Sequence, residues 1–170
     1  MKALLYELAT DIFTVQENVA IPVPGVDEIR VKCLATALNP VDAKVFGWKG
    51  SIPAGITHTT LGLDVCGIVD EIGTNVTGFE KGDYVLYHGR MLTPHNGFAE
   101  YAIHDALTTI NFGKTLPMDP VVLAATPCAA WTAYRTLVDK LRIPKIGSSE
   151  TDDRSLCVTG ASGGVGTFAV

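Results

Sequence analysis

Seven residues close to the C-terminus constrain the fold more than any other part of the sequence. Residues 160–166 read Gly-Ala-Ser-Gly-Gly-Val-Gly, follow an apolar run at residues 156–158 and precede a helix-forming segment. A strand, a glycine-rich turn and a helix in this order are typical of the start of a dinucleotide-binding fold. The three places that need small residues, for the bend, the pyrophosphate and helix packing, hold Ala161, Gly163 and Gly166. The alternative is a glycine-rich turn without a ligand, which the flanking strand and helix patterns disfavour.

Backbone N–H groups in such a turn, and the positive end of the helix that follows, face the negative phosphates of a cofactor. The sequence therefore predicts cofactor contacts at Ala161, Ser162, Gly163, Gly164, Val165 and Gly166. No Lys-Ser or Lys-Thr pair follows the glycines, which excludes the phosphate loop of nucleotide hydrolases.

The first 112 residues have a different character, with short apolar segments separated by turns rich in Gly, Pro and Asn. Their spacing predicts an all-β barrel or sandwich. The expected strands cover residues 2–8, 13–19, 28–38, 63–72, 83–88 and 97–103. Gly67 inside a strand indicates a bulge or the close approach of another backbone. One short helix is expected from Pro40 to about Phe46, because proline is favoured at the first helical position.

Residues 119–141 are rich in Ala, Leu and Thr and predict helices. Asp119 suits a helix cap and Pro120 a first position, while Pro127 implies a break, so two helices that meet there are expected. Residues 141–154 are polar and predict a loop. The predicted organisation is a substrate domain, a connecting region, and a first strand (residues 155–159) and helix start of a Rossmann domain. Their boundaries are 1–118, 119–154 and 155–170.

Composition disfavours several classes of protein. Apolar residues make up 47% of the chain, which supports a packed core, and the formal charge is −5 without a basic stripe for nucleic acid. No run of about 18 apolar residues predicts a membrane span, and the N-terminus lacks a signal-peptide pattern, so a cytoplasmic protein is expected. The cysteines are dispersed and are expected to be reduced, buried apolar groups: Cys33, Cys66, Cys128 and Cys157.

Four further stretches carry a family resemblance. They are Ala-Leu-Asn-Pro-Val-Asp-Ala-Lys at 37–44, Leu-Gly-Leu-Asp-Val-Cys-Gly-Ile-Val at 61–69, Lys-Gly-Asp-Tyr-Val at 81–85 and Gly-Phe-Ala-Glu-Tyr at 97–101. Together with Thr-Ala-Tyr at 132–134 and the glycine turn, they resemble the medium-chain dehydrogenases/reductases, in the zinc-independent quinone oxidoreductase and enone reductase branch. The resemblance implies a GroES-like β-barrel, connecting helices and the first βα unit of a Rossmann domain. It also implies an oxidoreductase that passes hydride from NADPH or NADH to a quinone or an α,β-unsaturated carbonyl.

The zinc-dependent branch of this family carries Gly-His-Glu where this chain has Gly62-Leu63-Asp64, and a Cys in the loop around residues 39–42. Leucine cannot ligate a metal, and four closely spaced cysteines are absent, so the sequence predicts no zinc. The histidines have no paired ligand spacing and are expected to be solvated or hydrogen-bonded loop residues: His58, His88, His95 and His104.

The resemblance implies catalytic roles for Asn39, Asp42 and Lys44. The Asn39 amide would bond a substrate carbonyl or the cofactor ribose. Lys44 would lie near the nicotinamide, where its charge orients the cofactor or stabilises oxyanion charge that develops during hydride transfer. The alternatives are a helix cap for Asn39, a first-turn carboxylate stabilised by the helix dipole for Asp42, and an exposed helix lysine for Lys44.

Further candidates would contact substrate or cofactor. The expected substrate pocket is lined by Phe46, Trp48, Ile52 and Asp64. For the three apolar residues the alternative is packing over the barrel mouth, and for Asp64 it is a buried partnership with a backbone group or Lys44. Thr132 would bond the nicotinamide carboxamide, or it bonds back into its own helix.

The sequence contains one strand of a cofactor sheet that needs about five or six. The residue that selects between NAD and NADP is expected about 20 residues beyond the turn. Residues 1–170 are therefore expected to bind the cofactor poorly and to be inactive by themselves. A homo-oligomer is one expected state. The alternatives are a non-enzymatic GroES-like module that binds a partner or a small molecule, and a zinc-type alcohol dehydrogenase, which Leu63 disfavours.

Overall fold

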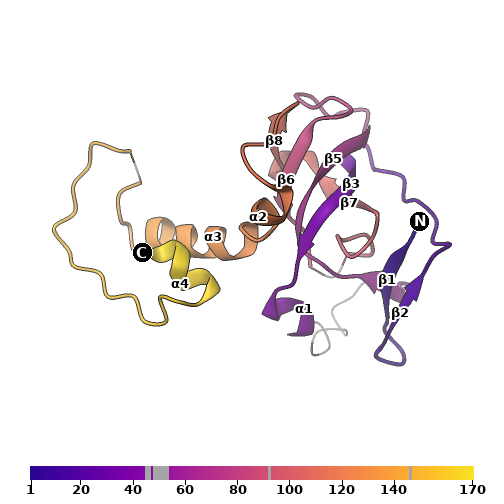
Figure 1. The fold of residues 1–170 in the computed structure, drawn as a ribbon, viewed down its shortest axis with the longest axis horizontal. Coiled ribbons are helices and arrows are strands. Elements are labelled where there is room, and N and C mark those ends of the chain that lie inside the picture. The colour runs from indigo at the N-terminus through magenta and orange to yellow at the C-terminus, as the bar shows by residue number, and fades with distance from the viewer. Residues whose placement is uncertain (45–46, 48–53, 92, 146) are drawn as a thin grey trace. The chain divides into compact units, whose positions relative to one another are not determined.

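A computed structural model describes residues 1–44, 47, 54–91, 93–145 and 147–170. The chain divides into two compact units, Met1–Ala125 (unit 1) and Thr126–Val170 (unit 2), which Figure 1 shows in ribbon form. The described part of unit 1 contains strands in two sheets and short helices, whereas the described part of unit 2 is helix and loop. The fold is mainly β with a few helices, as predicted.

The larger sheet of unit 1 carries its core. Its strand order is β7-β3-β5-β6-β8, and all neighbours are antiparallel. The strands are β3 (Glu28–Ala37), β5 (Asp64–Ile72), β6 (Tyr84–His88), β7 (Tyr101–Asp105) and β8 (Ile110–Gly113). Alternate residues of a strand share one face, so β-branched residues two apart build a continuous apolar layer. The buried cluster consists of Ile29, Val31, Val65, Val69, Val85 and Tyr87.

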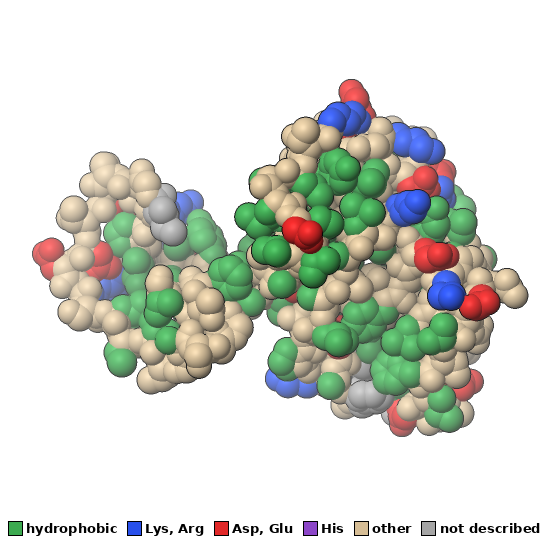
Figure 2. Space-filling model, in the orientation of Figure 1, with side chains coloured by type: hydrophobic (Ala, Val, Ile, Leu, Met, Phe, Trp, Pro, Cys, Tyr) green, Lys and Arg blue, Asp and Glu red, His purple; other side chains and the backbone are tan. Residues whose placement is uncertain are grey.

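The smaller sheet has the order β2-β1-β4 and is also antiparallel. Its strands are β1 (Ala3–Glu7), β2 (Ile12–Gln16) and β4 (His58–Thr60). Every residue of the edge strand β2 is exposed. Figure 2 shows hydrophobic side chains gathered over part of the face of unit 1 that is in view. Unit 1 therefore has a well-covered large sheet and a small sheet with an open edge.

The predicted barrel takes the form of these two sheets, which do not close into a continuous barrel within the described residues. An isolated bridge pairs Ala3 with Ala99, and the Leu4 N–H donates to the Phe98 carbonyl oxygen at 2.8 Å. A single bridged pair does not make a ladder, and strand β7 begins at Tyr101 rather than at Gly97. The strands β4 and β8 were not predicted, because three or four residues are too few to show an alternating pattern.

The helices begin where the prolines predict. Helix α1 spans Pro40–Lys44, α2 spans Pro120–Ala124 and α3 spans Pro127–Tyr134, followed by a π-helical segment, η3 (Arg135–Lys140). The Asp119 carboxylate accepts a hydrogen bond from the Val121 N–H at 2.7 Å, which is the predicted cap. None of the helices in the described ranges is long and apolar enough to cross a bilayer.

The first connecting helix lies in unit 1. Leu123 and Ala124 of α2 are buried against Cys66 and Leu86 of the large sheet. The boundary between the units falls after Ala125, whereas the predicted end of the first domain is residue 118. An apolar pair on a five-residue helix accounts for this difference, because its burial ties α2 to the sheet.

Unit 2 differs from the prediction at one element. The expected strand at residues 155–159 does not form, and Leu156 is 47% exposed. A strand needs a partner for its backbone N–H and C=O groups, and unit 2 contains no second strand in its described residues. Helix α4 (Gly164–Ala169) follows the glycine turn as predicted.

Gly67 gives a direct test of how tightly β3 and β5 pack. A Cβ at this position would lie 2.4 Å from the Lys32 carbonyl oxygen and 2.4 Å from Val31 Cγ1. We expect Gly67→Ala to lower the free energy of unfolding by roughly 1–3 kcal/mol, because neither neighbour can move without disturbing the sheet. Urea denaturation of wild type and variant measures the change.

Gly25→Ala is the matched control for this substitution. A Cβ at Gly25 would meet the end of the Glu28 side chain at 3.0 Å, and that flexible carboxylate can rotate away. Equal stability of the Gly67→Ala variant and wild type would contradict the close backbone approach.

Candidate functional site

Asp42 fixes the start of α1. Its carboxylate, which is 8% exposed, accepts hydrogen bonds from the Asn39 N–H at 2.8 Å and the Gly62 N–H at 3.1 Å. The Asp42 N–H in turn donates to the Asn39 carbonyl oxygen at 3.0 Å. These bonds tie the loop after β3 to the segment that enters β5. Asp42 therefore lies in the first turn of α1, as the alternative to a catalytic role required, namely a carboxylate stabilised by the helix dipole.

Asp64 lies at the centre of the polar cluster. Its side chain is 1% exposed, and its Oδ2 accepts a hydrogen bond from Asn39 Nδ2 at 3.0 Å. Its Oδ1 lies 2.6 Å from Nδ1 of His88. Burying a carboxylate is costly unless donors surround it, and these two side chains supply them. Asp64 therefore partners Asn39 and His88 rather than Lys44.

Strand register explains why Asp64 and His88 meet. Asp64 is the first residue of β5 and His88 is the last residue of β6, and the two are directly opposite in the antiparallel ladder. Directly opposite residues place their side chains on the same face of a sheet, at contact distance. Ala37 of β3 is the partner of Asp64 on its other side, which brings the loop with Asn39 to the same sheet end.

His88 was expected to be a solvated or hydrogen-bonded loop residue, and it is hydrogen-bonded at the end of strand β6. A signal for the contact was present. An acid at the start of one predicted strand and a histidine at the end of the next are opposite one another if the two strands pair as antiparallel neighbours.

The glycine turn of unit 2 has a defined geometry. Gly160 adopts φ +70, and its carbonyl oxygen accepts from the Gly163 N–H at 2.9 Å. A Cβ on Gly166 would lie 2.2 Å from the Gly160 carbonyl oxygen. Gly166, the third of the small residues, is therefore required where α4 packs on the turn. The sequence had predicted that this glycine lets the helix pack on a strand.

The start of α4 is exposed. Thr167 closes the first turn of α4 by donating its hydroxyl to the Gly163 carbonyl oxygen at 2.9 Å. The first N–H groups of any helix have no partner within the helix. Ser162, Gly163, Gly164 and Val165 are exposed, so a phosphate group has access to the turn.

A family model for the alcohol dehydrogenase GroES-like domain matches residues 25–114. The chain belongs to the alcohol dehydrogenase GroES-like domain family. The match covers the large sheet from the loop before β3 to the end of β8, including Asn39, Asp64 and His88. This is the catalytic-domain family of the medium-chain dehydrogenases/reductases, as the sequence motifs predicted.

Curated relatives of this GroES-like chain are oxidoreductases by name. A zinc-type alcohol dehydrogenase-like protein from Staphylococcus epidermidis is 32% identical, over 89% of this chain and 43% of that protein. A quinone oxidoreductase from Lama guanicoe is 32% identical, over 94% of this chain and 44% of that protein. A 2-methylene-furan-3-one reductase from Solanum lycopersicum is 33% identical, over 95% of this chain and 40% of that protein. The chain spans less than half the length of these relatives.

Solved structures share the fold. An alcohol dehydrogenase superfamily protein from Novosphingobium aromaticivorans matches with a TM-score of 0.81 and 27% identity. The match covers 99% of this chain and 48% of that protein. The chain therefore shares its fold with a solved member of the alcohol dehydrogenase superfamily.

Two further predicted site residues, Lys44 and Thr132, lie in helices α1 and α3. Lys44 is exposed at the last turn of α1, where a positive charge complements the helix dipole. The Thr132 hydroxyl donates back to the Cys128 carbonyl oxygen at 2.6 Å within α3. Phe46, Trp48 and Ile52 lie outside the described residues.

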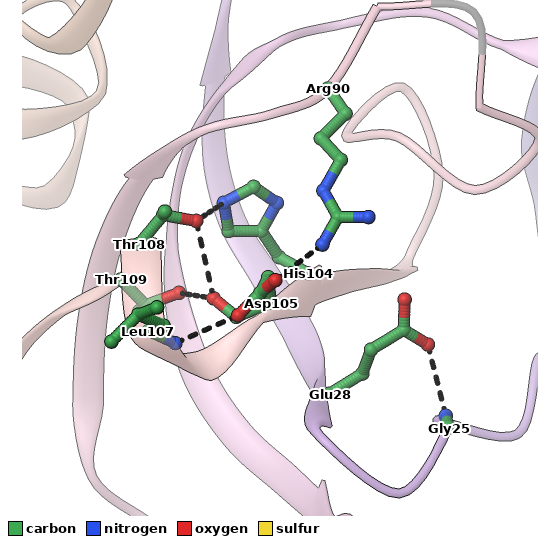
Figure 3. Close-up of polar contacts among 8 residues, drawn as sticks. All are labelled: Gly25, Glu28, Arg90, His104, Asp105, Leu107, Thr108 and Thr109. Carbon is green, nitrogen blue, oxygen red and sulfur yellow. Dashed lines mark hydrogen bonds and ion pairs between the residues drawn. The ribbon is translucent and has the colours of Figure 1, made fainter.

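A second polar cluster borders a cavity of about 270 Å³ in unit 1 (Figure 3). Arg90 forms an ion pair with Asp105 at 2.5 Å, and the Asp105 carboxylate also accepts from the Leu107 N–H at 2.9 Å. His104 stacks on the Tyr87 ring at 4.2 Å between centroids. The Nε2 atom of His104 lies 3.0 Å from the Thr108 hydroxyl.

The buried position of His104 has a consequence for acid stability. Burial, together with the nearby positive charge of Arg90, lowers the pKa of His104 from 6.5 to about 4. The unfolded chain therefore takes up a proton at higher pH than the folded chain does. We expect the free energy of unfolding to fall as pH decreases from about 6.5 to about 4, with His104 contributing up to ~3 kcal/mol.

His104→Gln isolates this contribution, because glutamine keeps a hydrogen-bonding group but does not titrate. Urea denaturation at pH 7 and at pH 4.5 should show a smaller loss of stability for the variant than for wild type. Identical losses in the two proteins would show that the pKa of His104 is the same in the folded and the unfolded chain, which would contradict the prediction.

Proposed function

We propose that unit 1 is the substrate-binding part of a zinc-independent, NAD(P)H-linked reductase of quinones or α,β-unsaturated carbonyls. The observation that carries this proposal is the hydrogen bond between Asn39 Nδ2 and the buried Asp64 carboxylate. One N–H of the Asn39 amide is held by Asp64, and an amide nitrogen has a second N–H to offer. A substrate carbonyl oxygen is a suitable acceptor for that second N–H.

The chemistry of such substrates fits this donor. When hydride adds to the β-carbon of a conjugated carbonyl, negative charge develops on the carbonyl oxygen. A preoriented N–H donor stabilises that charge more than it stabilises the neutral carbonyl. Relatives named quinone oxidoreductase and 2-methylene-furan-3-one reductase support this substrate class. The cofactor supplies the hydride when bound, and Asn39 orients and polarises the acceptor.

The glycine turn fits the pyrophosphate of such a cofactor. Residues 162–165 are exposed, and a Cβ on Gly166 would meet the Gly160 carbonyl oxygen, so the turn has room only for glycine there. We propose that residues 161–166 hold the phosphates of NADPH or NADH, and that Lys44 and Thr132 contact the nicotinamide side.

Independence from zinc is part of the proposal. Leu63, which is 4% exposed, stands where the zinc-dependent branch has a histidine ligand, and its side chain has no ligand atom. The zinc-type name of one relative makes the zinc-dependent reaction the second candidate. Asp64 and His88 are residue types that ligate zinc, so metal content separates the two candidates.

Binding of a small enone tests the proposed substrate site. We expect 2-cyclohexen-1-one to shift the NMR signals of the Asn39 side-chain amide and the His88 imidazole at millimolar concentration. Asn39→Ala should weaken the binding about 10-fold, because one hydrogen bond contributes about 1–1.5 kcal/mol. Heteronuclear titration spectra of wild type and variant give both affinities.

Asn75→Ala is the matched control, since Asn75 also donates from Nδ2 to a carboxylate, Asp27, at 3.0 Å. It should bind the enone as wild type does. Unchanged affinity in Asn39→Ala, or shifts confined to other residues, would contradict the proposed site.

Cofactor affinity is a separate prediction. Unit 2 offers the glycine turn and α4, but its described residues form no sheet beside them. We propose that residues 1–170 bind NADPH with a dissociation constant of ~1 mM or weaker and do not turn over substrate by themselves. Nicotinamide fluorescence during an NADPH titration measures this. Micromolar affinity would contradict it.

A further inference from the structure

We propose that Asp42 is a positioning residue for Asn39, the proposed donor to the substrate carbonyl, and does not itself contact the substrate. This inference rests on the proposed function, because it concerns the same substrate site. Asp42 takes over the capping of α1, and the Asn39 side chain is thereby left to the site.

The start of α1 is capped from within the helix. The Asp42 carboxylate accepts the N–H of Asn39, three residues earlier, at 2.8 Å. Asp42 is the third residue of α1, which begins at Pro40. An acidic side chain at the third helical position that holds the backbone N–H of the cap residue is one half of a capping box. Asp42 therefore satisfies a backbone group that the helix itself leaves without a partner.

The other half of a capping box is replaced by a different bond. In a complete box the side chain of the cap residue accepts the N–H of the third helical residue. Here the Asp42 N–H donates to the main-chain carbonyl oxygen of Asn39 at 3.0 Å, and Asn39 Nδ2 donates to Asp64 Oδ2 at 3.0 Å. The Asn39 amide thus serves the substrate site, because Asp42 and the backbone meet the needs of the helix.

A second bond of the Asp42 carboxylate ties the Asn39 loop to the strand that carries Asp64. Asp42 Oδ1 accepts the N–H of Gly62, two residues before Asp64, at 3.1 Å. Gly62 has φ +88, and a Cβ there would lie 2.4 Å from the Phe98 ring, so its backbone has little room to follow a displaced loop. The loop is therefore held at two points, and the Asn39 amide keeps its place beside Asp64.

Burial and bonding give Asp42 an indirect role. The residue is 8% exposed, and each of its carboxylate oxygens accepts a main-chain N–H. A substrate that contacted this carboxylate would have to displace the backbone of Asn39 or Gly62. Asp42 therefore acts through Asn39.

Asp42→Asn tests this role. Asparagine has nearly the same shape but only one acceptor oxygen, so its NH₂ group faces one of the two main-chain N–H groups. We expect the affinity for 2-cyclohexen-1-one to fall roughly 3- to 10-fold, the upper limit being the loss of one oriented hydrogen bond. The side-chain amide signals of Asn39 should move as well, because its bond to Asp64 is disturbed. Heteronuclear titration spectra report both changes.

A double-mutant cycle shows whether the effect passes through Asn39. In an Asn39→Ala background, Asp42→Asn should change the enone affinity by less than about 2-fold, because the group through which Asp42 acts is gone. A merely structural role would weaken binding by the same factor in both backgrounds, and that result would overturn the inference.

Asp83→Asn is the matched control. Asp83 is 5% exposed, and its carboxylate accepts the N–H of Glu80, three residues earlier, at 2.8 Å. Its own N–H donates to the Glu80 carbonyl oxygen at 3.0 Å, as in the Asp42 turn. This variant should lose stability in urea and keep the enone affinity within about 2-fold of wild type. An equal loss of affinity in Asp83→Asn and Asp42→Asn would attribute the effect to destabilisation and overturn the inference.

The enone titration keeps the two proposals distinguishable. Binding that Asn39→Ala weakens and Asp42→Asn does not would overturn the role of Asp42 and leave the proposed function standing. Absence of enone binding at Asn39 in wild type would overturn both. If Asp42→Asn does not fold, NMR couplings across the hydrogen bonds of wild type decide. Couplings from the backbone nitrogens of Asn39 and Gly62 to the Asp42 carboxyl carbon are expected, and absence of either would overturn the inference.

Discussion

The buried carboxylate of Asp64 is the constraint on which the site depends. An acid that is 1% exposed must be surrounded by donors, and these come from Asn39 after β3 and His88 at the end of β6. Asp42 adds a second buried carboxylate that ties the same loop to Gly62. The two acids together hold the ends of three neighbouring strands and the start of α1 in one geometry.

Much of unit 1 could be predicted from local pattern. Alternating apolar residues located β3, β5 and β6, and Pro40, Pro120 and Pro127 located the helix starts. Gly67 marked a close backbone approach, and the register of β3 and β5 does shift between Cys33 and Ala35. These features depend on residues close in sequence, or on the absence of a side chain, and both are visible without coordinates.

The rest depended on pairing between distant segments. Asp64 was a candidate, but its partners are 25 and 24 residues away, and the choice between Lys44, a backbone group and His88 is made by strand register. The strand at residues 155–159 failed for the related reason that a strand is a property of a ladder and not of one apolar run. The turn and the helix after it form local hydrogen bonds, from Gly163 to Gly160 and from Thr167 to Gly163, and both elements were predicted correctly.

The central claim is that the Asp64 carboxylate is satisfied by hydrogen bonds from side chains and not by a metal ion. Metal analysis by mass spectrometry, after purification in the presence of zinc and desalting, tests it most directly. The account predicts far less than one zinc per chain and a melting temperature that a chelator does not change. One zinc per chain, lost in both Asp64→Asn and His88→Gln, would contradict it.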